Sequence, residues 1–138
     1  MSKLEAFLRP AVSDKVKEVV VSDRFHGEDG KPAKITIKPI TQAENERLIK
    51  LSTHTKKDKG QVFEAFDGGE YRARLVVECT VFPDFKQKEL CDAYGVVDPL
   101  DVSRKMFNSG EYARLIDEIM EINGHKDIEE LNEEAKNS

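Results

Sequence analysis

The sequence has no tryptophan, few aromatic residues and only two cysteines among its 138 residues. Because aromatic residues make up only 7% of the chain, we expect an aliphatic core. Cys79 and Cys91 are twelve positions apart and have no cysteine or histidine near them at the spacing of metal ligands. Two cysteines also do not make a disulfide framework. We therefore expect reduced thiols that fill apolar space in a cytoplasmic protein.

Long hydrophobic runs are also absent. No apolar segment approaches the roughly 18 residues that a membrane span requires. The first residues, Met1 to Glu5, contain no apolar core of a signal peptide. The sequence therefore predicts no membrane partner, and its length suits one domain with a sizeable core.

Dense positive charge is lacking as well, since 22 basic and 27 acidic residues give a net charge of −5. The segment from Glu111 to the end carries nine acidic and three basic residues, or −6, so that residues 1–110 sum to +1. Binding to phosphate backbones requires clustered positive charge, and we expect no nucleic-acid partner. We interpret residues 1–124 as one domain and residues 125–138 as an acidic C-terminal helix or tail.

Capping motifs mark the expected helices. In a capping box, a side-chain oxygen precedes by three residues a Glu or Gln that can bond back to the amide of the cap. This pattern occurs at Ser2–Glu5, Thr41–Glu44, Asp67–Glu70 and Asp84–Gln87. Further helix starts are expected at Asp98–Pro99 and at Ser109. The expected ends are at Pro83, Gly95 and Gly124.

Apolar periodicity separates helices from strands. An apolar stripe with helical spacing predicts a helix between residues 110 and 123; it comprises Tyr112, Leu115, Ile116, Ile119 and Met120. Alternation of apolar and polar residues predicts two earlier strands, one with Val19, Val21 and Phe25 on one face and one with Ile35 and Ile37. Turn-forming residues 27–32 lie between them, so we expect an antiparallel hairpin whose apolar face packs on helices.

Two further segments are harder to assign. Residues 71–81 are rich in β-branched side chains, which favours a strand, but the Asp67 cap and the length before Pro83 favour a helix, which we predict. Residues 54–66 contain a charged run and are expected to form a mobile connection. The predicted fold is α+β: an N-terminal helix, an antiparallel β-hairpin, and then four or five helices packed on it.

Motifs of catalysis are absent. There is no glycine-rich phosphate loop and no nucleophile elbow, and the histidines fall in predicted turns or helix ends. We therefore expect no enzyme, no catalytic residue, no cofactor and no metal. One alternative is a metal-dependent nuclease, because Asp84 is followed by Lys86 and Lys88. That motif needs a second acid beside the lysine, and a role as helix cap explains Asp84 better.

Binding by packing is the activity that the composition favours. Met106 and Phe107 end one predicted helix and precede the turn formers of residues 108–110, so they suit the edge of a groove for a partner helix. The candidate contact residues on the helices and the hairpin face are Phe25, Ile37, Met106, Phe107, Tyr112, Leu115 and Ile119. The alternative is that the same side chains fill the core.

The order of short motifs is more informative than any one of them. It runs from residues 4–8 through residues 19–25, 29–32, 35 and 37–41 to the later signature of residues 79–85, 89–90, 94–96, 98–99 and 110–112. In this order and spacing the chain resembles the tail assembly chaperones of long-tailed phages and PBSX-type prophages. The resemblance spans about residues 4–124 and fades in the acidic segment after Gly124.

The resemblance implies a non-enzymatic factor of the host cell cytoplasm. Such proteins bind the tape measure protein, help recruit tail tube subunits around it, and are absent from the mature virion. The alternative is a structural tail component that is retained in the virion. The sequence leaves open whether the chain forms a homo-oligomer and whether a longer, frameshifted product exists.

Overall fold

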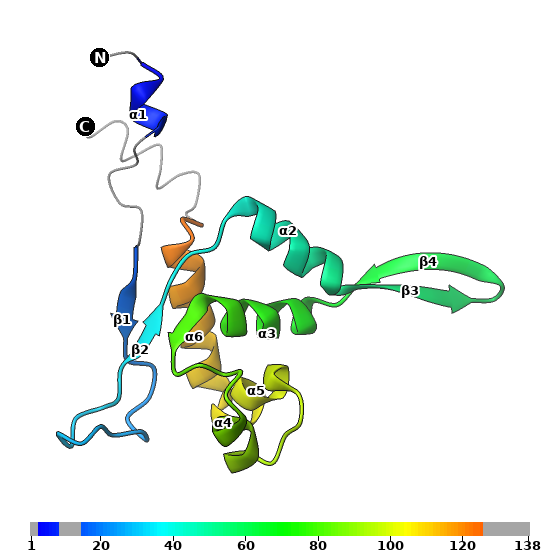
Figure 1. Ribbon diagram of the computed structural model, residues 1–138. Helices are drawn as coiled ribbons and strands as arrows, with labels where there is room; N and C mark the ends of the chain where they lie inside the picture. Colours follow the sequence, from blue (N-terminus) through cyan, green and yellow to red (C-terminus); the bar gives the residue numbers. More distant parts are fainter. Residues whose placement is uncertain (1–2, 9–14, 126–138) are drawn as a thin grey trace.

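The computed structural model describes residues 3–8 and 15–125. The fold is α+β, as predicted (Figure 1). Its elements in chain order are α1 (Glu5–Leu8), β1 (Lys17–Val19), β2 (Ile35–Ile37), α2 (Gln42–Leu51), β3 (Thr53–Asp58), β4 (Gln61–Phe66), α3 (Gly68–Cys79), β5 (Thr80–Phe82), α4 (Lys88–Ala93), the 3-10 turn η1 (Pro99–Asp101), α5 (Val102–Met106) and α6 (Ser109–Ile122). The predicted cap Ser2 and nearly all of the predicted acidic tail lie outside the described residues.

The predicted antiparallel hairpin is confirmed, but its first strand is shorter than expected: β1 ends at Val19, so Val21 and Phe25 lie in the loop that follows it. The hairpin belongs to a three-stranded sheet with the order β1-β2-β5. Val19 faces Ile35 across the pair β1–β2, and both side chains are buried. The third strand, β5, pairs antiparallel with β2 and places Thr80 opposite Ile37. This strand comes from the segment that the sequence left ambiguous.

Residues 71–81, which the sequence allowed to be a helix or a strand, are mostly helical but end in a strand. The Asp67 side chain accepts the backbone N–H of Glu70 at 3.0 Å, and the helix that it starts, α3, runs to Cys79. The chain then turns into β5 three residues before Pro83 could have ended the helix. Because β-branched Thr80 and Val81 gain a ladder with β2, tertiary pairing ends α3 earlier than the local signals indicate.

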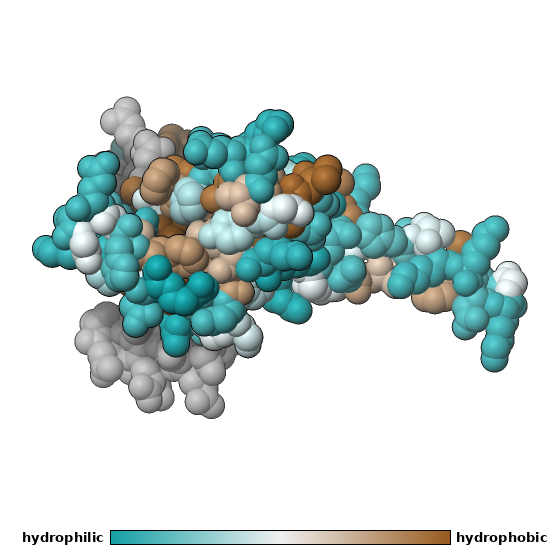
Figure 2. Space-filling view, turned by 90° about the horizontal axis from the view of Figure 1, so that it is seen from below, coloured by the Kyte–Doolittle hydropathy of each residue, from teal (hydrophilic) through white to brown (hydrophobic). Residues whose placement is uncertain are grey.

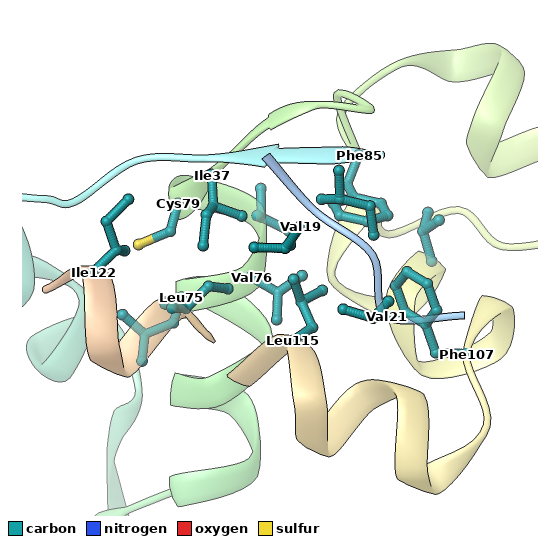
Figure 3. Close-up of a cluster of buried hydrophobic side chains, with 14 of the residues drawn as sticks. Val19, Val21, Ile37, Leu75, Val76, Cys79, Phe85, Phe107, Leu115 and Ile122 are labelled. Carbon is teal, nitrogen blue, oxygen red and sulfur yellow. The ribbon is translucent and has the colours of Figure 1, made fainter. Parts of the chain in front are cut away.

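Helices α3 and α6 pack on the inner face of the sheet and enclose an aliphatic core (Figure 3). The predicted stripe of α6 is confirmed: Leu115 and Ile119 are fully buried at its centre, and its other members are partly buried on the flanks. Cys79 and Cys91 are free and buried, as expected. Burial raises the pKa of the Cys79 thiol to about 11.

Two predicted helix starts are corrected. Helix α4 begins at Lys88 after an N-cap at Gln87, so Asp84 is not its cap. The Asp84 carboxylate instead accepts the backbone N–H of Lys86 at 3.0 Å in a turn. Helix α6 is capped by Asn108, one residue before the expected Ser109. The capping box at Thr41 is confirmed in full.

The expectation of a mobile connection over residues 54–66 is wrong. These residues form most of the antiparallel hairpin β3–β4, which projects from the body of the molecule and is here called the arm (Figure 1). Its two-residue turn holds Lys59 at φ 50° and Gly60 at φ 79°, as a type I′ turn requires. The charged run concealed the turn because these residue types are common in solvated loops.

Candidate functional site

An apolar cleft of about 170 Å³ lies between the loop after β1, the residues that follow β5, and the end of α5. We call it the apolar cleft. Its apolar lining side chains are Val21, Phe25, Ile35, Phe82, Pro83 and Met106. Phe82 is 65% exposed at its rim, while Phe25 and Met106 are half-buried. The cleft therefore offers open apolar surface that no other part of residues 3–8 and 15–125 covers.

Two buried aromatic rings support the cleft from below. The Phe25 ring meets the Phe107 ring edge to face at a centroid distance of 6.1 Å. Phe107 in turn meets the fully buried Phe85 at 6.3 Å, also edge to face. This row of rings links the cleft to the core, so that Phe25 stands on a packed base rather than on a free loop.

A charged clamp fixes one wall of the cleft. The Arg24 guanidinium donates to both carboxylate oxygens of Glu111, with 3.0 Å from Nε to Oε2, and donates to the Met106 carbonyl at 3.0 Å. It also lies 4.9 Å from the centre of the Phe25 ring. Arg24 therefore ties the loop that carries Phe25 to the end of α5 and the start of α6.

The Glu111 carboxylate is almost enclosed in this clamp, since its side chain is 4% exposed. It also accepts the backbone N–H of Asn108 at 2.9 Å, which closes the capping box of α6. The hydrogen bond from Arg24 outweighs the opposing effect of burial and lowers the pKa of Glu111 to about 2. The carboxylate is therefore ionised throughout the neutral range.

Only two of the predicted contact residues, Phe25 and Met106, line the apolar cleft. Four others are buried in the core, namely Ile37, Phe107, Leu115 and Ile119. They contribute core packing and leave no surface for a partner in this fold. Tyr112 is half-buried on α6, outside the cleft. Contact with a partner through Phe25, Met106 or Tyr112 stays a prediction.

The arm is a second surface, and the sequence interpretation missed it. In the space-filling view it extends from the body with apolar patches among polar ones (Figure 2). Val62 is 61% exposed and Phe63 is 46% exposed. The signal that could have found it is the two-residue turn Lys59-Gly60 followed by the β-prone segment 61–66.

Helices α2 and α3 hold the base of the arm. Buried Ser52, the C-cap of α2, accepts the backbone N–H of Asp67 at 2.7 Å. The rings of Phe66 and Tyr71 lie 5.6 Å apart, and His54 Nε2 lies 2.9 Å from Glu70 Oε1. Contacts on both strands therefore orient the arm relative to the body.

The chemistry of both surfaces is that of noncovalent contact. Within residues 3–8 and 15–125, no group of three or more His, Cys, Asp or Glu side chains is arranged to hold a metal ion. Over the same ranges, no helix has the length and apolar character needed to cross a bilayer. What the described surface does provide is exposed apolar side chains on a rigid base.

Comparisons with known proteins agree with the resemblance in motifs. Residues 4–136 match the family of phage XkdN-like tail assembly chaperone proteins, so the match extends past residue 124. The chain is 36% identical over 137 residues to the phage-like element PBSX protein XkdN of Bacillus subtilis strain 168, covering 96% of this chain and 93% of that protein. It is 40% identical over 124 residues to the uncharacterized protein YqbN of the same strain, covering 87% and 83%.

A solved structure extends this agreement to the fold. The crystal structure of the protein YqbN superposes with a TM-score of 0.71 at 32% identity. The superposition covers 88% of this chain and 96% of that chain. The fold described above is therefore shared over nearly the whole of that relative.

Proposed function

This chain belongs to the phage XkdN-like tail assembly chaperones, and we propose that it binds a tape measure protein and recruits tail tube subunits around it. Binding occurs by noncovalent packing in the host cell cytoplasm. Family membership supports the class of activity. Binding to these two partners is the proposal, and the exposed apolar surface of this chain is the observation that supports it.

The apolar cleft is the observation that carries the proposal. A chaperone for aggregation-prone helices needs accessible apolar surface. The cleft provides it on a base held by the Arg24–Glu111 clamp, and one apolar ridge of a client helix would suit a cleft of this size. Weak contacts of this kind add up when they repeat along a long client. The net charge of −5 helps to keep a protein with such a surface soluble.

We expect Phe82→Asp to weaken binding of the tape measure protein by at least about tenfold, because a carboxylate at an apolar contact must lose its water without gaining a partner. Phe82 is 65% exposed, so the substitution should change the folded state little. The measurement is co-expression with the tape measure protein, followed by gel filtration of the complex.

The matched control is Val97→Asp. Val97 is 98% exposed and does not line the cleft, so the same gain of charge should leave the complex intact. Equal circular dichroism melts of the two variants would show that both fold. A complex that survives Phe82→Asp, or is lost equally in Val97→Asp, would contradict a binding role for the cleft.

The proposal also predicts that the protein is missing from finished particles. Mass spectrometry of purified virions should detect tube and tape measure peptides but no peptide of this chain. Recovery of this chain in amounts comparable to a tail component would instead support the structural alternative.

A further inference from the structure

Two exposed arginines converge at the start of α3, close to the base of the arm (Figure 1). The Arg104 guanidinium, on α5, donates to the carbonyl of Gly69 at 2.9 Å. The Arg72 guanidinium folds back over the same turn. Its Nη1 lies 3.5 Å from the position that a Cβ atom would take on Gly68, and its Nη2 lies 4.0 Å from that position on Gly69. Both side chains therefore present their charge on one small area, here called the arginine pair.

Two aromatic side chains lie beside the arginine pair. Phe66, at the end of β4, is 52% exposed, and its ring atom Cε2 lies 3.9 Å from the Cβ position of Gly68. Tyr112 on α6 is half-buried, and burial raises the pKa of its phenol while the positive charges of Arg104 and Arg72 oppose that rise. Both guanidinia therefore lie near the phenol, because such an effect weakens with distance. Arginine and aromatic side chains together are the composition enriched at the energetic centres of protein interfaces.

The carboxylates around the arginine pair are engaged elsewhere or only loosely placed. Asp67 accepts the backbone N–H of Glu70 at 3.0 Å in the cap of α3, and the Glu70 carboxylate is held in an ion pair within α3. Asp101 lies 3.6 Å from Arg104, too far for a good hydrogen bond. Within residues 3–8 and 15–125, Arg72 forms no ion pair. Its positive charge is therefore available to another molecule.

We propose that the arginine pair is a docking site for an acidic segment of a partner polypeptide. A guanidinium offers parallel N–H groups to the two oxygens of a carboxylate, and this paired contact is stronger than that of a point charge. One carboxylate of the partner bridges Arg72 and Arg104, and an apolar side chain next to it lies on the exposed ring of Phe66. The site therefore takes a Glu or an Asp that neighbours an apolar residue.

A polypeptide suits this surface better than a nucleic acid does. Nucleic-acid binding draws on many phosphate contacts and a broad basic surface, whereas the arginine pair is small and the chain carries a net charge of −5. A single carboxylate needs no such surface. The 52% exposed ring of Phe66 also offers apolar contact to the side chain of a peptide.

The arginine pair differs from the apolar cleft in place and in chemistry. Neither Arg72 nor Arg104 lines the cleft, and neither do the two aromatic side chains beside them. Contacts between charges on a protein surface steer association and add specificity, whereas apolar contacts supply most of the affinity. The two sites can therefore engage different segments of a partner, and binding at the arginine pair is the part that salt weakens.

Two short synthetic peptides and the full chain test this proposal. The acidic probe is a fluorescein-labelled peptide in which glutamate alternates with leucine and phenylalanine, and the neutral probe has glutamine in place of every glutamate. In fluorescence anisotropy at low salt, the wild type should bind the acidic probe at least about tenfold more tightly than the neutral probe. This preference should shrink as salt is added, because exposed charges are screened.

The decisive variant is Arg72→Glu. Arg72 is exposed and has no ion pair in the described part of the chain, so the variant should melt at the temperature of the wild type. It should bind the acidic probe at least about tenfold more weakly, and it should gain affinity for a probe with lysine in place of glutamate. A merely structural role of Arg72 would not reverse the preference for charge. If Arg72→Glu melts early, Arg72→Gln gives the same test of the acidic probe without an added negative charge.

Arg47→Glu is the matched control. Arg47 is an exposed arginine on α2 that lies 3.5 Å from Glu78, and Lys86 lies 3.7 Å from the same carboxylate. The same change of charge at Arg47 should leave binding of the acidic probe unchanged. Equal binding of the acidic and neutral probes by the wild type, or an equal loss in Arg47→Glu and Arg72→Glu, would overturn the proposal. No tape measure protein is present, so this outcome is independent of the function proposed above.

Discussion

Phe107→Ala is expected to lower the free energy of unfolding by about 3 to 5 kcal/mol, the usual cost of truncating a buried Phe. Phe107 is buried and meets both Phe25 and the fully buried Phe85 edge to face. Its removal leaves a void between the core and the apolar cleft. Since a domain has only about 5 to 15 kcal/mol of stability, this loss is a large share of the total. Urea unfolding followed by circular dichroism measures it.

The control for Phe107→Ala is Val97→Ala. The Val97 side chain is 98% exposed, so its truncation should change stability by less than about 0.5 kcal/mol. The pair of variants also tests the role assigned to Phe107. A stable Phe107→Ala variant that had lost only its binding to the tape measure protein would show a contact residue instead of a core residue.

Stability is expected to fall as the pH drops below about 4.5, and Glu111 should account for a large part of this fall. The clamp with Arg24 lowers the pKa of Glu111 from 4.5 to about 2 in the folded chain. A depressed carboxyl pKa stabilises the fold above the unfolded value, and that stabilisation is lost as the pH falls through the folded value. Thermal melts between pH 7 and pH 2 measure the effect.

Glu111→Gln separates this contribution from those of other carboxylates. The variant should melt at a lower temperature at pH 7, because Arg24 loses its ion pair, and should lose less stability on acidification. Glu18→Gln is the control, since Glu18 lies 3.5 Å from Lys34 in an exposed ion pair of the kind that contributes little. An unchanged pH profile in Glu111→Gln would show that the clamp does not stabilise the fold.

The sequence by itself determined the elements whose signals are local. The cap at Thr41, the apolar stripe that buries Leu115 and Ile119, and the antiparallel hairpin that contains Val19 and Ile35 all appear as predicted. Capping and periodicity involve residues within one or two turns of each other, so neighbouring residues suffice to specify them. The order of the motifs also identified the family.

Only the tertiary structure decided the features that depend on distant residues. The end of α3 at Cys79 follows from the pairing of β5 with β2, and the clamp joins Arg24 to a residue 87 positions away. Likewise, the sequence shows that residue 107 is an apolar Phe, but it does not show whether a partner or the core covers this side chain. Burial and strand pairing depend on which segments meet in space. The charged strand β3 has no strand signal of its own and is recognised only together with the turn and the β-prone strand β4 that follow it.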